Sequence, residues 1–235
     1  MKSFLKRANR GLILGAIVLV GFVVFVITDT IGFKKNKPQI EAAVTAYTSA
    51  LGECAVTSSS KDEFKKKADN LMSDYWCSDS NSGNSDNYYG INISGYRNQL
   101  DTVAAEDYSG KKTENKITKW TANPFDFSIT KSGPGYATVQ FECKIVAEFT
   151  GNPYLLTPCE VMPVRDFSYY GDSHDKTNAL TQFSMSATYV IKVKEIDGKW
   201  KVCSAQSWGW ASPELTVLDP VSYTHLRAHE TDQYL

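Results

Sequence analysis

Histidine is nearly absent from this chain of 235 residues, which contains only three. Its five cysteines form no C-x-x-C pair; they are Cys54, Cys77, Cys143, Cys159 and Cys203. Zinc sites need clustered Cys and His ligands at such spacings, so we expect no metal site and no cofactor. An odd number of cysteines leaves at least one unpaired, and the disulfide pairing among the five stays open.

A basic excess is also missing. The chain has 25 Lys and Arg against 26 Asp and Glu, and residues 38–219 alone have 17 against 23. The basic residues are not concentrated in one expected element. Nucleic-acid-binding domains usually carry a basic patch, so nucleic acid is not expected as a partner. No internal repeat is present.

One long hydrophobic run stands out, because residues 11–28 carry no charge and follow Lys2, Lys6, Arg7 and Arg10. A helix rises about 1.5 Å per residue, so residues 11–33 are long enough for the roughly 30 Å bilayer core. The sequence therefore predicts a transmembrane anchor at residues 11–33, behind a basic cytoplasmic segment at residues 1–10. A GxxxG pattern at Gly11 and Gly15 leaves self-association through this helix open.

Two other interpretations of this run are a cleaved signal peptide and a buried soluble helix. No small-x-small cleavage site follows the run, which disfavours the signal peptide, although whether the anchor is cleaved stays open. Long C-terminal domains translocate largely regardless of charge. We therefore expect a single-pass protein of the cell membrane with its C-terminal domain outside the cytoplasm.

The C-terminal segment at residues 220–235 is interpreted as non-native. From Val221 onward it reads VSYTHLRAHET, which resembles a translated sequencing adapter. This interpretation removes His225 and His229, whose i, i+4 spacing suggests metal ligands. The natural C-terminus is then unknown.

Between anchor and tail, residues 38–219 predict one extracytoplasmic domain, joined by a short stem at residues 34–37. Pro38 suits the first turn of a helix, and the spacing of Ile40, Val44, Tyr47 and Leu51 predicts a helix over residues 38–54. The 17 helical residues expected after Ser60 are too long for a disulfide between Cys54 and Cys77.

Ser60 and Glu63 form a capping box that starts a second helix, antiparallel to the first. In this motif the Glu63 carboxylate is expected to reach back to Ser60 while Ser60 caps Glu63. Its lysine run is interpreted as a solvated face, with a lipid-headgroup patch as the alternative. The run is Lys65, Lys66 and Lys67.

A polar loop follows at residues 78–90, with a third, short helix near residues 94–105. The loop resembles a calcium loop in composition, but it lacks the D-x-[DN]-x-[DN]-G register and the closing Glu. Its oxygen-bearing residues are Asp79, Asn81, Asn84, Asp86 and Asn87.

From Lys116 the pattern has period two. It predicts strands at residues 136–149 and 181–196, with alternate residues facing inward. Asp197 and Gly198 predict a two-residue hairpin turn into a strand beginning near Trp200. Simple alternation then places Cys143 and Cys203 on opposite faces of the sheet, so they should not pair. Residues 150–180 contain three prolines and predict an elaborated loop.

Helices followed by long antiparallel strands, with a last hairpin that reads DGKWKV, resemble the nuclear transport factor 2-like cone, also called SnoaL-like or cystatin-like. The resemblance covers residues 38–209. It implies an α+β domain in which two to three helices pack on a curved antiparallel sheet. It also implies a possible role in bacterial envelopes, where anchored members of this family mediate assembly.

No convincing catalytic constellation is present. Ser173, His174 and Asp175 are adjacent in sequence and cannot normally converge as a triad. Enzymes of the resembled family use an Asp or His beside a Tyr inside the cone, for which Asp126 and Tyr189 are the nearest candidates. Alternation points Asp126 outward, between two phenylalanines. We therefore predict no catalytic, cofactor-binding or metal residues.

Trp200, Trp208 and Trp210 are interpreted as core or sheet-edge residues, with a carbohydrate or partner surface as the alternative. The function favoured by the sequence is a membrane-anchored, extracytoplasmic, non-catalytic interaction or assembly module of the bacterial envelope. It would bind the membrane through residues 11–33 and a protein partner, or itself, through the domain. A small-ligand-binding cone is the alternative, and a cone-fold enzyme comes third. Partner or ligand identity and oligomeric state stay open.

Overall fold

The computed structural model describes residues 10–78, 90–110, 114–166, 179–210 and 213–218. The chain divides into two compact units, Met1–Ile40 and Glu41–Leu235. Helix α1 (Arg10–Ala55) begins in the first unit and ends in the second.

The helix start predicted at Pro38 is wrong, because α1 continues through residues 34–37 and contains Pro38. Proline lacks a backbone N–H and usually kinks or ends a helix, so the pattern placed a boundary there. The stem is thus helical.

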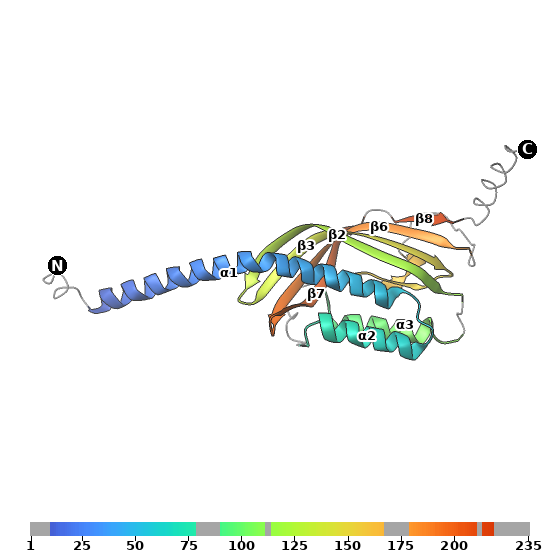
Figure 1. The fold of residues 1–235 in the computed structure, drawn as a ribbon, viewed down its shortest axis with the longest axis horizontal. Coiled ribbons are helices and arrows are strands. Elements are labelled where there is room, and N and C mark those ends of the chain that lie inside the picture. Colours follow the sequence, from blue (N-terminus) through green and yellow to red (C-terminus); the bar gives the residue numbers. More distant parts are fainter. Residues whose placement is uncertain (1–9, 79–89, 111–113, 167–178, 211–212, 219–235) are drawn as a thin grey trace, which may run out of the picture. The chain divides into compact units, whose positions relative to one another are not determined.

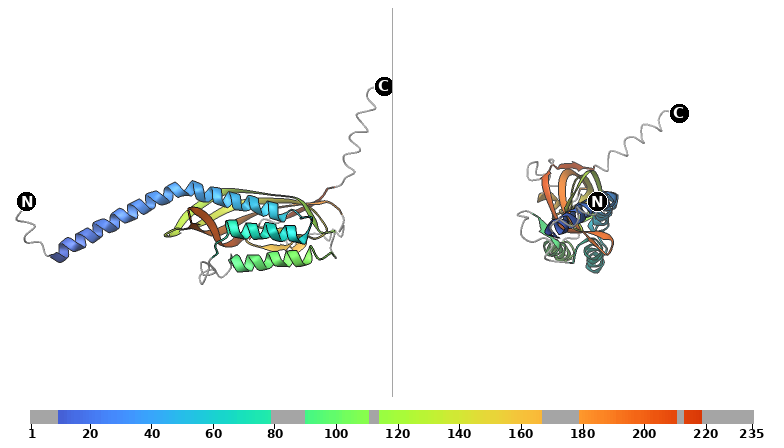
Figure 2. Two further views of the ribbon diagram at one scale, coloured as in Figure 1. Left: turned by 60° about the horizontal axis from the view of Figure 1, so that its bottom comes forward. Right: turned by 90° about the vertical axis from the view of Figure 1, so that its left-hand side faces the viewer.

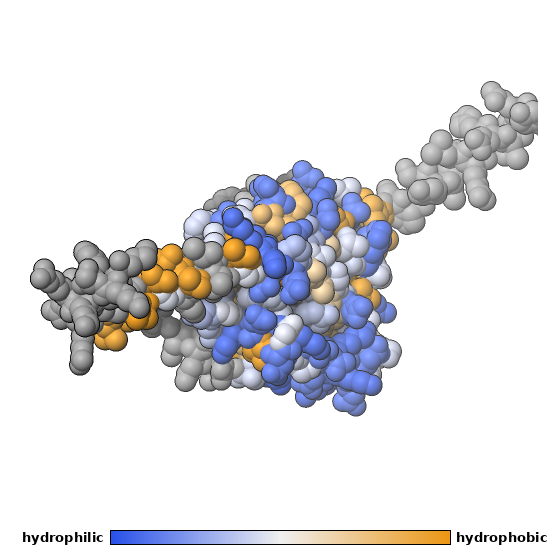
Figure 3. Space-filling model, turned by 60° about the vertical axis from the view of Figure 1, so that its left-hand side comes forward, coloured by the Kyte–Doolittle hydropathy of each residue, from blue (hydrophilic) through white to orange (hydrophobic). Residues whose placement is uncertain are grey.

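In the first unit, nine large apolar side chains of α1 are between 45% and 67% exposed. They are Leu14, Ile17, Val18, Leu19, Val20, Phe22, Val23, Val24 and Ile31. Figure 3 shows apolar residues gathered along this part of the helix. The side chains of residues 10–13, 16 and 25–29 lie outside the description. Among the residues that are described, no helix qualifies by length and hydropathy as a membrane span.

In the second unit, three helical segments lie on one face of a six-stranded sheet (Figures 1 and 2). They are the end of α1, α2 (Lys61–Tyr75) and α3 (Ile93–Glu106). The strands are β1 (Ile91–Asn92), β2 (Lys116–Gly133), β3 (Tyr136–Thr150), β6 (Thr181–Ile196), β7 (Lys199–Trp210) and β8 (Glu214–Val217). Their order is β1-β7-β6-β3-β2, with β8 also paired to β6, and every pairing is antiparallel. The α+β class is therefore confirmed.

The core lies between the helices and the inner face of the sheet. Every second residue of β3 from Ala137 to Phe149 and of β6 from Phe183 to Val193 is at most 4% exposed, as the period-two pattern predicts. The helical stripe of Ile40, Val44, Tyr47 and Leu51 is equally buried. Gly52 of α1 allows the helix to approach β2 closely, since an added Cβ would lie 2.7 Å from the Trp120 ring. The ring contact of Tyr47 with Tyr75 fits the predicted antiparallel α1 and α2.

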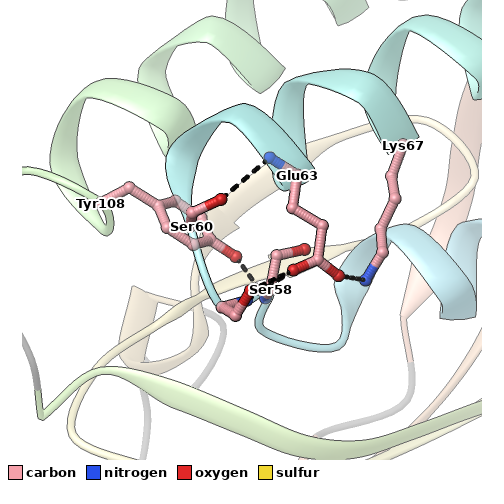
Figure 4. A network of polar contacts seen from close by, with 6 residues as sticks. Ser58, Ser60, Glu63, Lys67 and Tyr108 are labelled. Carbon is pink, nitrogen blue, oxygen red and sulfur yellow. Dashed lines mark hydrogen bonds and ion pairs between the residues drawn. The ribbon is translucent and has the colours of Figure 1, made fainter.

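The capping box at the start of α2 is confirmed in one half and corrected in the other (Figure 4). The Glu63 N–H donates to Ser60 Oγ at 3.2 Å, as predicted. The Glu63 carboxylate, however, accepts from the N–H and hydroxyl of Ser59, at 2.9 and 2.5 Å, and not from Ser60. Lys67 pairs with Glu63 at 3.1 Å, while Lys65 and Lys66 are exposed.

A single disulfide is present among the described residues and joins Cys77, just after α2, to Cys203 of β7. Cys54 and Cys143 are free and buried, so neither of the bonds excluded from sequence forms. The predicted register of β7 is wrong after Val202, because a bulge inserts Cys203 between the pairs Val193–Val202 and Lys192–Ser204. Simple alternation cannot anticipate an inserted residue.

The region predicted as a loop at residues 150–180 contains a buried hairpin. Strands β4 (Tyr154–Leu156) and β5 (Val161–Pro163) pair antiparallel and lead into a short 3₁₀ turn, η1 (Val164–Asp166). Prolines at three positions favoured a loop in the sequence, but two of them lie at strand ends or turns where no ladder hydrogen bond is needed. The hairpin forms the centre of the candidate site.

Candidate functional site: the buried β4–β5 hairpin

The tip of the β4–β5 hairpin consists of Thr157, Pro158, Cys159 and Glu160. The Thr157 N–H donates to the Glu160 carbonyl at 2.9 Å, and the Glu160 N–H donates back to the Thr157 hydroxyl at 3.1 Å. Proline is favoured at the second position of a β-turn because its φ is already suitable. The residues of the turn thus supply the hydrogen bonds that close it.

Two helices hold the tip from one side through tyrosine hydroxyls. Tyr47 of α1 donates to the Pro158 carbonyl at 2.9 Å, and Tyr96 of α3 donates to the Thr157 carbonyl at 2.8 Å. Trp76 stacks on the Tyr96 ring, with centroids 5.1 Å apart, and meets Tyr47 edge-on. Both tyrosines are fully buried, and burial raises the pKa of each hydroxyl well above its ordinary value.

Tyr189 of β6 reaches the same interior from the sheet. Its ring packs against Phe141, which stacks in turn on Phe127. Burial first, and then Cys159, Cys143 and Glu160, raise the pKa of Tyr189 well above its usual range. Its hydroxyl makes no hydrogen bond of good geometry in the described part of the chain, although a side-chain interaction with Thr157 opposes the rise in pKa.

Glu160 is the ionisable group at the hairpin tip. Burial raises the pKa of its half-buried carboxyl to about 7, so it titrates near neutrality. Its Oε1 atom is buried and has no hydrogen-bond partner among the described residues. Glu160 and Tyr189 thus offer an acceptor and a donor whose hydrogen-bonding capacity is unused.

The free cysteines around this interior are chemically quiet. Burial raises the pKa of the Cys54, Cys143 and Cys159 thiols to about 12. The nucleophilic form of cysteine is the thiolate, which is scarce at neutral pH when the pKa is this high. Within the described segments, no group of three or more His, Cys, Asp or Glu side chains is arranged to hold a metal.

The structure does not bring the two sequence candidates together. Asp126 is exposed at a bulge of β2 with a φ of 56°, whereas Tyr189 is fully buried. Trp200 is buried, and Trp208 is 68% exposed. The Ser173–Asp175 run, the calcium-like loop at residues 79–89, the tail at residues 220–235 and the side chain of Trp210 lie outside the described residues.

Sequence reasoning missed four residues of this site, which are Tyr47, Tyr96, Thr157 and Glu160. One available signal was the Thr-Pro-Cys-Glu turn between the apolar pairs Leu155-Leu156 and Val161-Met162. Such a pattern is typical of a tight hairpin. No sequence signal connects that turn to tyrosines more than 60 residues away.

No protein-family model and no curated protein matches this chain. Among solved structures, it is similar to a candidate scytalone dehydratase from Novosphingobium aromaticivorans DSM 12444, at 13% identity and a TM-score of 0.41. That similarity covers 83% of this chain and 97% of the other. A candidate aromatic ring hydroxylase from Novosphingobium aromaticivorans is 12% identical, with a TM-score of 0.40 and coverage of 78% and 94%. Similarity at this level assigns neither an activity nor residue roles to this chain.

Proposed function

We propose that this protein is a membrane-anchored, extracytoplasmic, non-catalytic interaction or assembly module of the bacterial envelope, with a cone-like domain. The observation that carries the proposal is that the hairpin tip fills the interior between helices and sheet. Thr157 is fully buried there, and Tyr96 and Tyr47 donate hydrogen bonds to the carbonyls of Thr157 and Pro158. A domain whose interior is occupied by its own chain presents its outer surface for binding.

The anchor is supported by the uncharged run at residues 11–28 and by the exposed apolar side chains of α1 in the first unit. Apolar side chains exposed all along a helix cost free energy in water, about 25 cal/mol per Å². A bilayer removes this cost, and residues 11–33 are long enough to cross it.

The external location is supported by the Cys77–Cys203 disulfide. Disulfides persist in oxidising compartments and are rare in the bacterial cytosol, where thiols are kept reduced. A domain outside the membrane would keep this bond.

The anchor is tested by expressing the full chain in bacteria and extracting the membranes with alkaline carbonate. The protein should stay in the membrane pellet, and a Val18→Asp/Val20→Asp variant should be lost from it. Lys65→Gln/Lys66→Gln is the matched control, because it makes an equal charge change at exposed positions of α2. Release of the unmodified chain by carbonate would overturn the anchor.

The interaction role is tested by crosslinking the full chain in native membranes. We expect a defined species, either with one specific partner or with a second copy, and the pattern should repeat at different expression levels. A chain that stays monomeric without a partner would overturn the module. Protease added to spheroplasts should digest the domain, and protection of it would overturn the external location.

A small-ligand-binding domain is the second candidate, favoured by the unpartnered atoms of Tyr189 and Glu160. A ligand with one donor and one acceptor would satisfy both, provided that the hairpin tip moved. Native mass spectrometry of the purified full chain should then reveal a bound small molecule, and Tyr189→Phe should release it. The absence of any bound mass would favour the interaction module.

A cone-fold enzyme is less favoured, because Asp126 is exposed and the buried thiols are protonated.

A further inference from the structure

Three lysines of the β6–β7 hairpin lie on the face of the sheet that points away from the helices, while the ammonium of a fourth, Lys201, reaches the end of α2. Inward residues of β6 are Tyr189, Ile191 and Val193, so Lys192 and Lys194 alternate to the outer face. Lys201 lies directly opposite Lys194, and Lys199 lies opposite Ile196, which shares that face. We call Lys192, Lys194 and Lys199 the lysine face.

Two lysines face each other on neighbouring strands of this hairpin. Like charges directly opposite each other on neighbouring strands are destabilising, and Lys194 and Lys201 form such a pair. Part of the cost is offset, because Lys201 Nζ donates to the Ser73 carbonyl in the last turn of α2 at 2.7 Å. Lys194 also lies over the Tyr136 ring, 5.3 Å from its centroid.

Among the described residues, few carboxylates lie beside the lysine face. Glu195 is opposite Trp200, which faces inward, and Asp197 lies in the turn. Along β3, Thr138 is the partner of Lys192, and the next acidic residue on that face is Glu142. Glu142 lies four residues along β3 from Thr138, which corresponds to about 13 Å. The domain is acidic as a whole, so this cluster is a local reversal of charge.

The turn between β6 and β7 lies at the end of the sheet where the second unit's part of α1 begins (Figure 1). The proposed anchor ends at residue 33, and this unit begins at Glu41. Eight residues span at most about 28 Å even when fully extended, so this end of the domain cannot leave the vicinity of the membrane. Residues 34–37 add three more lysines to the connection.

We propose that the lysine face docks on the anionic lipid surface of the membrane that holds the anchor, and so sets the orientation of the domain. This inference rests on the proposed membrane anchor. Lysines close to an anionic bilayer are attracted to it, and the attraction decays within a Debye length of about 10 Å at 0.1 M salt. Docking would leave the opposite end of the domain directed toward a protein partner.

The test uses the full chain in nanodiscs of phosphatidylcholine alone or with phosphatidylglycerol. Lysine acetylation is followed by mass spectrometry, with the exposed Lys65 and Lys66 of α2 as internal controls. We expect Lys192 and Lys199 to lose reactivity in the anionic nanodiscs, Lys65 and Lys66 to keep it, and high salt to restore it. Equal reactivity of Lys192 and Lys199 in both lipids would overturn the inference.

A Lys192→Gln/Lys199→Gln variant should weaken docking about fivefold per lysine removed, measured as amide exchange of the β6–β7 turn in anionic nanodiscs. Lys65→Gln/Lys66→Gln removes the same charge from α2 and should leave that exchange unchanged. Equal effects of the two variants would overturn the inference. A chain that fails to enter nanodiscs overturns the anchor and the inference together, whereas entry with unchanged lysine reactivity overturns the inference alone.

Discussion

At the scale of single residues, three buried tyrosines share one interior but differ in their hydrogen bonds. Tyr47 and Tyr96 donate to carbonyls of the hairpin tip, whereas the Tyr189 hydroxyl has no partner among the described residues. Removing the partner of a buried polar group is destabilising, because the group stays desolvated without a hydrogen bond. A buried group that has no partner already carries this desolvation cost in the folded protein.

Tyr47→Phe should therefore destabilise the domain by about 1–2 kcal/mol, because the Pro158 carbonyl is left buried and unsatisfied. Tyr189→Phe is the matched substitution and should be neutral or stabilising. Urea unfolding of both variants measures the difference. Equal losses of stability would show that the hairpin tip does not depend on the Tyr47 hydrogen bond.

Glu160 makes stability depend on pH. Its pKa is raised from 4.5 to about 7 in the folded state, so the folded protein binds more protons than the unfolded chain between these values. The contribution of Glu160 to the free energy of unfolding is therefore fully present below pH 4.5. It falls as the pH rises and levels off above about pH 7. We expect Glu160→Gln to be more stable than the unmodified chain at pH 8 and to lose this dependence, as followed by thermal unfolding. An unchanged profile would contradict the assignment.

At the scale of elements, the N-terminus of α2 is stabilised partly by its predicted cap and partly by residues that the capping motif does not include. Ser60 caps the helix, as its motif predicts. The Glu63 carboxylate turns to Ser59, and hydrogen bonds from Ser59, followed by Lys67, lower the pKa of Glu63 to about 2. Stability linked to Glu63 is present above pH 4.5 and is lost as pH falls toward 2, opposite to Glu160.

Ser60→Ala should cost about 1 kcal/mol, since it leaves a backbone N–H of the first helical turn without an acceptor. Ser73→Ala, at an exposed position late in α2, serves as the control and should change little. Chemical denaturation at pH 7 measures both. Similar behaviour of the two variants would mean that the cap contributes nothing to the stability of the domain.

The β7 bulge is the other instructive element. Residues before it follow the predicted alternation, and Cys203 itself is the extra residue. The insertion brings Cys203 to the position where Cys77, at the end of α2, can reach it. Backbone contact accompanies the bond, because the Cys77 N–H donates to the Val202 carbonyl at 2.8 Å.

At the scale of the whole molecule, the Cys77–Cys203 disulfide ties the helical layer to the sheet across 126 residues of chain. Crosslinking so long a loop restricts the unfolded chain strongly, by roughly 4–5 kcal/mol in the chain-entropy view. Cys77→Ala/Cys203→Ala should lower the unfolding temperature substantially, and reductant should lower that of the unmodified chain but not of the variant. An unmodified chain insensitive to reductant would contradict the role of this bond.

The sequence by itself determined the elements whose signals are local. Period-two alternation predicted β3 and β6, the Asp197–Gly198 pair predicted the turn in which both residues have positive φ, and Ser60 predicted the start of α2. The apolar run at residues 11–28 is equally local, and the anchor predicted from it stays a prediction. Each of these features depends only on residues that are close together in the chain, so the sequence pattern is enough to predict it.

Only the tertiary structure decided the rest, because each remaining feature depends on residues far apart in the chain. The disulfide partner of Cys203 and the tyrosines that hold the hairpin tip both arise from strand register and helix packing. A single bulge shifts every later side chain of a strand to the other face, and nothing in the linear pattern announces it. Pairing and burial are properties of the folded chain, so the candidate site emerged only from the fold.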